Sequence, residues 1–381
     1  MYCVASELLK LGHRVAIAAR DLTHFPQFFS GLDVQAFQSP YFRGCFPGSY
    51  NPPSTFPHIL HNCCCGDSDT FLGLIKVWQQ LFDLVRPDAV LFDHSPTAIL
   101  ASRGRSFYRA TINNGFFAPP DESPLPSWRS QLPSDLGQFK DDEMKILETL
   151  NATAQMLGQN QLTQVSHLYA ELDDNFLFTY PEFDHFACRR DGNYVGTREP
   201  EGGNAPVWPS DGGPRVFVYL KSFPNFPVVL FHLARLQLAS VVYAPGAVPP
   251  DFLAKFRDSQ ANVMIADSAL SLGRVATECD FAITNGTHGT VAAMLRAGVP
   301  TLNFPLTLEQ QILCDRVSNC GMGITACPRD QTCVEPALYQ LLETASLKTC
   351  ARKFARKYSE YDGFERFLTR LNAVLPLNSQ E

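Results

Sequence analysis

The run from Asp280 to Gly323 constrains the fold more than any other part of this sequence. A short apolar segment, Phe281 to Thr284, has the composition of a buried strand. It leads into the turn Asn285-Gly-Thr-His-Gly-Thr, and the helical segment that follows stops at Gly298. A second strand is predicted after Pro300. A turn of this kind presents backbone N–H groups and a helix N-terminus at the carboxyl end of a strand, and both favour a bound phosphate.

Strand and helix patterns alternate through both halves of the chain. In the first half, strands are predicted at 14–19, 34–37, 89–92, 109–112 and 175–179, and helices at 2–11, 69–85 and 141–158. In the second half, strands are predicted at 215–220, 240–244, 261–266, 281–284, 300–304 and 322–325, with helices between them and at 345–358 and 364–375. This alternation predicts an α/β fold of two Rossmann-like domains, each with a helix-covered parallel sheet, facing each other across a cleft.

Two features divide the chain. Residues 192–215 are rich in Gly and Pro and lack apolar periodicity, so we expect a first domain at 1–195, a linker at 196–214 and a second domain at 215–381 with the C-terminal helices. The first predicted element is a helix that leads into a strand, as in a βαβ unit without its first strand. This indicates either an unconventional start of the fold or an N-terminal truncation.

Composition narrows the class of protein. The 381 residues are 45% hydrophobic and 18% charged, which supports a packed core. The net charge is −7 and no Lys/Arg-rich run stands out, so we do not expect a nucleic-acid partner. No signal peptide or membrane-spanning run is recognisable. The twelve cysteines lack zinc-type spacing, which favours reduced thiols in a cytoplasmic protein and predicts no metal site.

The turn offers several candidate ligands for a nucleotide sugar. Gly286 and Gly289 permit close backbone approach, and Thr287 and Thr290 carry hydroxyls, although an ordinary capped turn has the same composition. His288 can meet a phosphate or face solvent.

The pair Glu309-Gln310 begins the next helix, where carboxylate and amide groups can hydrogen-bond sugar hydroxyls. Alternatively, Glu309 has no ligand role and stands at the helix N-terminus because the helix dipole favours a negative charge there. Lys221 and Ser222 end the first strand of the second half, and Lys221 is either a diphosphate ligand or a solvated lysine.

In the first half, Asn113 and Asn114 end a strand and, with Phe116, are candidates for a second ligand pocket, although a plain turn has the same composition. The aromatic loop at 41–56 adds to this apolar character and fits a lipid or a flat polyketide-like molecule. Packing of the core under a long loop is the alternative.

The motifs together resemble a known family. The runs Asn285-Gly-Thr-His-Gly-Thr, Ala297-Gly-Val-Pro, Pro305-Leu-Thr-Leu-Glu-Gln and Gly321-Met-Gly are similar to the donor-binding signature of GT-B glycosyltransferases. The similarity is to bacterial relatives of the plant flavonoid and macrolide glycosyltransferases. It departs from the family pattern at three positions: Asn285 stands for a His, Thr287 for a Gly and Ala293 for an acidic residue. The resemblance implies an acceptor-binding first domain, where Asn113, Asn114 and Phe116 would line the acceptor pocket, and a donor-binding second domain.

The resemblance also implies a mechanism. Members invert the sugar carbon without a metal or cofactor: a His in a loop after the first strand takes the acceptor proton, and an Asp orients that His. Asp93 matches the Asp, whereas the His has no match, because the corresponding strand and loop would precede Met1. His94 is a weak substitute, since its side chain should point away from the site if Asp93 points in.

The expected function is thus transfer of a sugar from a nucleoside-diphosphate sugar, as with UDP-sugars, to a small or lipidic acceptor. A catalytically inert or truncated nucleotide-sugar-binding protein is the second interpretation, and a nucleotide-sugar epimerase is a third. Peripheral membrane contact stays open, and the sequence indicates neither the oligomeric state nor the identities of the sugar, base and acceptor.

Overall fold

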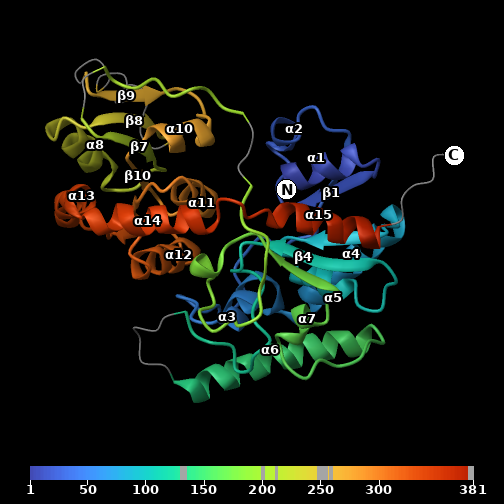
Figure 1. Ribbon diagram of the computed structural model, residues 1–381. Helices are drawn as coiled ribbons and strands as arrows, with labels where there is room; N and C mark the ends of the chain where they lie inside the picture. The colour runs from blue at the N-terminus through green and yellow to red at the C-terminus, as the bar shows by residue number, and fades with distance from the viewer. Residues whose placement is uncertain (129–134, 199–201, 211–212, 247–255, 257–260, 376–381) are drawn as a thin grey trace. The chain divides into compact units, whose positions relative to one another are not determined.

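The computed structural model describes residues 1–128, 135–198, 202–210, 213–246, 256 and 261–375 (Figure 1). These residues form two compact units. The first unit comprises Met1–Phe178, Phe186–Val195 and the C-terminal segment from Gly363. The second comprises Thr179–His185 and Gly196–Asp362.

The second unit contains a six-stranded, fully parallel sheet. Its strands are β7 (Arg215–Tyr219), β8 (Ala239–Tyr243), β9 (Val263–Ala266), β10 (Phe281–Thr284), β11 (Thr301–Asn303) and β12 (Gly323–Thr325). The order across the sheet is β12-β11-β10-β7-β8-β9. Beginning at the central β7, the chain therefore builds one half of the sheet outward and then returns to build the other half from β10. This is the doubly wound arrangement that the alternation of strands and helices predicted.

Helices cover this sheet because its strands are apolar on both sides. All residues of β10 and β11 are buried. One core joins the sheet to α8 (Phe226–Arg235) and α13 (Val334–Glu343), and a second joins it to α10 (Leu272–Glu278) and α11 (His288–Arg296). The unit also contains α12 (Leu308–Asn319), α14 (Ala345–Lys357) and the 3-10 turns Pro181–Phe183 and Gln331–Cys333.

The first unit has two parallel sheets. One pairs β1 (Val15–Ala19) with β2 (Val34–Gln38), and the other has the order β3-β4-β5-β6. The strands of the larger sheet are β3 (Ala89–Phe92), β4 (Tyr108–Asn113), β5 (Asp174–Leu177) and β6 (Asn193–Tyr194). No strand among the described residues hydrogen-bonds β1 to β3.

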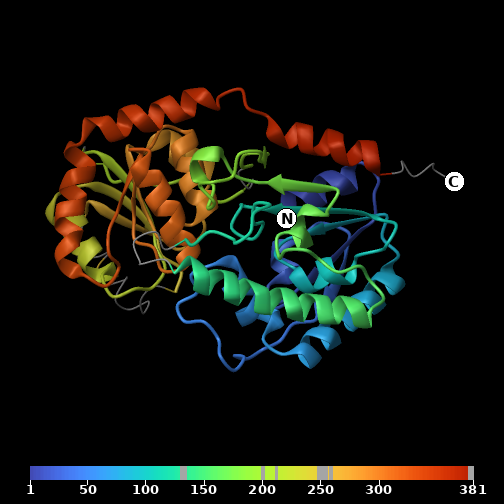
Figure 2. The ribbon, with the colours of Figure 1, turned by 90° about the horizontal axis from the view of Figure 1, so that it is seen from below.

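The longer helices of the first unit were predicted from the sequence, but several short ones were not. The helices are α1 (Tyr2–Lys10), α2 (Phe25–Phe28), α3 (Phe56–Leu60), α4 (Ser68–Val85), α5 (Pro96–Ala101), α6 (Leu136–Met156), α7 (His167–Ala170) and α15 (Gly363–Val374). Figure 2 shows α6 as the longest of these helices, in green. Among the short helices, α2, α3 and α7 were not predicted, and a π-helical turn at His61–Cys65 follows α3.

The expected domain boundary also needs correction. We expected the C-terminal helices to lie in the second domain, but α15 packs on the first unit, where Phe364, Phe367 and Leu371 join a core with Val4 and Phe176. The segment Thr179–His185 conversely belongs to the second unit. Parts of the expected linker, residues 199–201 and 211–212, and the final residues 376–381 lie outside the described residues.

Candidate functional site

The topology of the second unit indicates where a ligand binds. Strand β7 lies between β8 and β10. The strands that follow β7 in the chain extend the sheet on one side of it, and the strands from β10 onward extend it on the other side. In open parallel sheets, ligands bind at the carboxyl ends of the strands at such a switch point. Tyr219 of β7 pairs with Thr284 of β10, so the segments that follow them begin side by side. These segments are Lys221-Ser222 and the turn Asn285–Thr290, both predicted from the sequence as donor-binding elements.

Asn285 builds the turn from within. Its side chain is 2% exposed. Its Oδ1 accepts the Lys221 N–H at 2.6 Å, and its Nδ2 donates to the Phe304 carbonyl at 3.0 Å. Asn285 therefore ties the ends of β7, β10 and β11 together. We expected a ligand contact from this side chain, but its donor and acceptor atoms are engaged inside the protein.

Gly286 is required by the geometry of the turn. Its φ is +75°, and a Cβ at this position would lie 2.4 Å from the Cys314 Sγ. Its N–H donates to Thr284 Oγ1 at 2.8 Å, and Thr284 Oγ1 donates to Asn303 Oδ1 at 2.7 Å. The Gly286 amide is thus engaged internally, contrary to its expected role as a phosphate donor. Sequence reasoning missed Thr284, Asn303 and Cys314: Thr284 was taken only as the last residue of a strand, and nothing in the spacing of Asn303 and Cys314 links them to the turn.

The N-terminus of α11 supplies amides that have no acceptor within the helix. Thr287 is the N-cap residue and its side chain forms no capping hydrogen bond. The first intrahelical bond runs from the Val291 N–H to the Thr287 carbonyl at 3.0 Å. The N–H groups of His288, Gly289 and Thr290 lie before this first intrahelical donor and consequently have no acceptor within the helix. Gly289 is exposed, and a Cβ on it would meet no atom within 4 Å. The N-terminus of α11 therefore combines backbone N–H donors without a helical acceptor, the positive end of the helix dipole and open space at Gly289.

The His288 side chain turns toward its own unit. Its Nε2 lies 2.7 Å from Thr179 Oγ1, and its ring packs edge-on against Phe183 at 6.3 Å between centroids. Burial, with a smaller contribution from His185, lowers the pKa of His288 to about 3. The imidazole is therefore neutral near pH 7. The Nε2 of this half-buried histidine is thus engaged inside the protein.

Glu309 and Gln310 lie in the first turn of α12, at the end of the neighbouring strand β11. Thr307 caps this helix by accepting the Gln310 N–H. The Gln310 side-chain oxygen accepts the Leu306 N–H at 2.8 Å, which leaves its amide group as the remaining donor. A Cβ added to Gly286 would lie 3.5 Å from the Cβ of Gln310, so Gln310 borders the turn. Glu309 is half-buried in the same helical turn.

Lys221 and Ser222 are both exposed after β7. The Lys221 backbone is fixed by Asn285 while its ammonium group extends from the surface. The structure thus places an exposed cation, anchored at its backbone, beside the turn.

In the first unit, Asp93 and His94 follow β3. Asp93 is exposed, whereas the His94 ring stacks on the Phe117 ring at 3.6 Å between centroids. His94 has a φ of 43°, a left-handed conformation that few non-glycine residues adopt. Burial, and secondarily the charge of Arg20, lowers the pKa of His94 to about 4. Its Nδ1 is buried without a hydrogen-bond partner among the described residues. The His94 ring therefore packs inside the first unit, while Asp93 beside it in the chain is exposed.

The acceptor candidates are mostly buried. Asn113 is 6% exposed and its Oδ1 accepts the Gly115 N–H at 2.7 Å, while its Nδ2 has no partner among the described residues. The Asn114 Oδ1 accepts the Phe116 N–H at 3.3 Å. Phe116 is 4% exposed and stacks on Trp128 at 4.7 Å. Its ring therefore belongs to the aromatic core, as the alternative interpretation held, rather than lining an open pocket.

The described residues contain no group of three or more His, Cys, Asp or Glu side chains arranged to hold a metal ion. The twelve cysteines carry free thiols. None of the helices in the described part of the chain has the length and apolar composition needed to cross a membrane.

Solved structures with the same arrangement identify the fold. The glycosyltransferase of kitacinnamycin superposes with a TM-score of 0.70 at 16% identity, over 98% of this chain and 94% of that one. The calicheamicin glycosyltransferase CalG4 superposes with a TM-score of 0.69 at 18% identity, over 99% and 94%. The chain has the GT-B glycosyltransferase fold. This agrees with the resemblance seen in the sequence.

Three further findings describe how this chain relates to known proteins. It matches no family model. A segment of 129 residues, 34% of the chain, is 28% identical to the sterol 3-beta-glucosyltransferase of Eremothecium gossypii. That segment spans 9% of the length of the fungal protein. The spinosyn rhamnosyltransferase SpnG, solved with spinosyn aglycone, shares the GT-B fold with a TM-score of 0.65 at 17% identity, over 97% of this chain and 95% of that one.

Proposed function

We propose that this protein is a glycosyltransferase that moves a sugar from a nucleoside-diphosphate sugar to a hydroxyl of a small or lipidic acceptor. The second unit binds the donor and the first unit binds the acceptor. The acceptor oxygen attacks the anomeric carbon, the bond from that carbon to the diphosphate breaks, and a base takes the hydroxyl proton. A single displacement of this kind inverts the anomeric carbon. The reaction needs no metal, and cytoplasmic nucleotide sugars are its source of donor.

The observation that carries the proposal is the N-terminus of α11 at the switch point of the sheet. Three successive amides, from His288 to Thr290, point away from any helical acceptor, and open space faces Gly289. Together with the positive helix end, these donors suit the two phosphoryl groups of a leaving diphosphate. The exposed Lys221 adds a cation beside them, while Glu309 and the free amide of Gln310 suit sugar hydroxyls.

Relatives by fold support a nucleotide donor and an aglycone acceptor. VinC is solved in complex with DTDP, and it shares the fold with a TM-score of 0.63 at 15% identity, over 98% of this chain and 95% of that one. SpnG is solved with its aglycone. We extend these ligand classes to this chain as part of the proposal.

The proposed proton acceptor is His94, with Asp93 beside it in the chain. The neutral imidazole has a buried Nδ1 that has no hydrogen-bond partner in the described part of the chain, so it can accept a proton. A pKa of about 4 makes it a weak base near neutral pH. We therefore expect slow transfer, and this weakness also favours the second candidate function, a catalytically inert protein that binds nucleotide sugars.

Two measurements on the full chain separate these functions. A thermal-shift screen with uridine, thymidine and guanosine diphosphates tests donor binding, since a ligand at 100 times its Kd stabilises the native state by about 2.7 kcal/mol. A transfer and donor-hydrolysis assay then tests catalysis. Binding with transfer that is lost in His94→Gln supports the enzyme. Binding with neither transfer nor hydrolysis supports the inert protein, and absence of binding to all three nucleotides would contradict both.

A further inference from the structure

Helix α14 of the second unit carries a concentration of positive charge. Its sequence, ASLKTCARKFARK, has five basic residues and no acidic one, in a protein whose net charge is −7. The sequence shows no prominent basic run because apolar residues separate the cations. The helical period of 3.6 residues then places most of them on the side of the helix away from its buried apolar residues.

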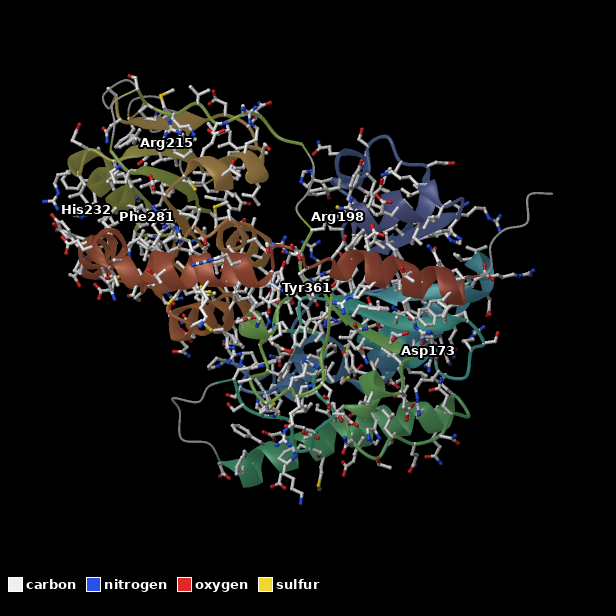
Figure 3. All side chains as sticks on the ribbon, viewed as in Figure 1. Asp173, Arg198, Arg215, His232, Phe281 and Tyr361 are labelled. Atoms are coloured by element: carbon white, nitrogen blue, oxygen red, sulfur yellow. The ribbon has the colours of Figure 1, made fainter. Side chains whose placement is uncertain are left out.

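The inner side of α14 holds the helix to the protein. Ala351 and Phe354 are buried in a core with Val291 and Leu295 of α11, and Leu347 is buried against the core of the sheet. Lys348 lies over the ring of Phe281, the residue labelled at the start of β10 in Figure 3, at 5.5 Å from the ring centroid. This side of the helix is thus buried in the second unit and is not available to bind another molecule.

Two of the five cations are neutralised by the protein. Lys348 pairs with Asp280 at 2.8 Å, and Lys357 pairs with Glu182 at 2.7 Å. Arg352, Lys353 and Arg356 are exposed, and none of the three forms an ion pair with the described residues. We call these three residues the α14 cationic face.

The charges of the α14 cationic face repel one another. Arg352 and Arg356 are four residues apart on one side of the helix, a spacing at which like charges repel. The Arg352 stem is held against Gly298, where an added Cβ would lie 3.1 Å from its Cγ. The three charges therefore lie near one another with no ion-pair partner in the described part of the chain, and an external anionic surface would relieve their repulsion.

We propose that the α14 cationic face docks the protein on the anionic lipid headgroups of a bilayer. Basic residues next to an anionic leaflet need no shaped pocket, because the attraction comes from the surface potential. A nucleic acid is the less suitable polyanion, since single strands are bound with aromatic side chains that stack on bases. None of the described residues of α14 is an exposed aromatic. The proposal does not depend on transferase activity.

Co-sedimentation with vesicles tests this surface. The full chain should bind vesicles of phosphatidylcholine with 30% phosphatidylserine at low salt, but not pure phosphatidylcholine vesicles, and binding should fall as NaCl screens the charges. In Arg352→Gln/Lys353→Gln/Arg356→Gln, partitioning should fall roughly 100-fold, since each basic residue near the leaflet contributes a factor of about 5.

A matched variant removes three other exposed cations, Lys76, Lys140 and Arg190, by substitution with Gln. It has the same net charge as the α14 variant and should bind vesicles as the unmodified protein does. Equal loss in both variants would overturn the proposal, as would absence of vesicle binding by the unmodified chain at low salt. Binding to single-stranded RNA that depends on the α14 cationic face, without binding to vesicles, would identify a different partner and also overturn it. The salt and phosphatidylserine dependence of the unmodified protein tests the surface even if the triple variant misfolds.

Discussion

The Asn285 side chain accepts the backbone N–H of Lys221 at 2.6 Å. Through this bond the turn that opens α11 and the exposed cation after β7 are fixed to each other at the switch point of the sheet. The second bond of Asn285, to the Phe304 carbonyl, extends the connection to β11. One buried amide side chain therefore positions three segments of the proposed donor site.

Replacement of Asn285 should destabilise the second unit. In Asn285→Ala, the N–H of Lys221 and the carbonyl of Phe304 lose their partners, and each unsatisfied buried group costs about 1–3 kcal/mol. We expect a loss of about 2–4 kcal/mol in the free energy of unfolding, measured by urea denaturation. Ser222→Ala, an exposed neighbour, is the control and should change little. An unchanged unfolding midpoint in Asn285→Ala would show that these bonds do not hold the turn.

The two glycines of the turn should respond differently to a side chain. Gly289→Leu should fold normally, because its Cβ meets open space, but should weaken nucleoside-diphosphate affinity at least about tenfold by blocking the amides. Gly286→Ala should lose stability, because its φ is +75° and its Cβ would collide with Cys314. Isothermal titration measures affinity and thermal unfolding measures stability. Unchanged affinity in a folded Gly289→Leu would remove the basis of the proposed donor site.

Loss of the Lys221 charge should affect binding but not folding. The side chain is exposed and its backbone N–H is retained, so Lys221→Gln should unfold like the unmodified protein. Its affinity for a nucleoside diphosphate should fall roughly tenfold at low salt, and the difference should shrink as salt screens the charge. Lys140→Gln on α6 is the matched control. Equal affinities for Lys221→Gln and this control would mean that the cation does not contact the diphosphate.

The lowered pKa of His288 should make the free energy of unfolding depend on pH. Its folded pKa of about 3 lies below the ordinary value of 6.5, so on acidification the unfolded chain takes up a proton before the native protein does. Stability from this residue is complete above pH 6.5 and is lost progressively as the pH falls toward 3. Between pH 7.5 and 5.0 the expected loss is about 2 kcal/mol.

His288→Gln tests this dependence, because glutamine can keep a hydrogen bond to Thr179 without titrating. Its unfolding free energy should fall by about 2 kcal/mol less over the same pH interval, measured by urea denaturation at both pH values. The pKa values of His58, His94 and His232 are also lowered by burial, so some acid sensitivity should persist. The same pH dependence in the variant and the unmodified protein would contradict a depressed pKa for His288.

Local sequence patterns predicted most of the secondary structure. Strand β3 was predicted at its observed bounds, and α14 was predicted to within one residue at its end, because apolar periodicity and flanking breakers are local signals. The short helix α3 was missed because its five residues lie in a Pro-rich, aromatic segment without periodicity. The side to which α15 packs could not be read from its amphipathic pattern, since an apolar stripe does not specify the partner it covers.

The sequence by itself determined the strand–turn–helix of the second unit, since the apolar run, the two glycines and the helix start lie within a dozen residues. It also determined which atoms of that turn are candidates for phosphate binding. Only the tertiary structure decided that the Asn285 side chain, the Gly286 amide and the His288 Nε2 are engaged internally, whereas Gly289 and Lys221 stay exposed. The physical reason is that hydrogen-bond partners such as Thr179 and Phe304 come from segments distant in the chain or from neighbouring strands, and their positions follow from packing.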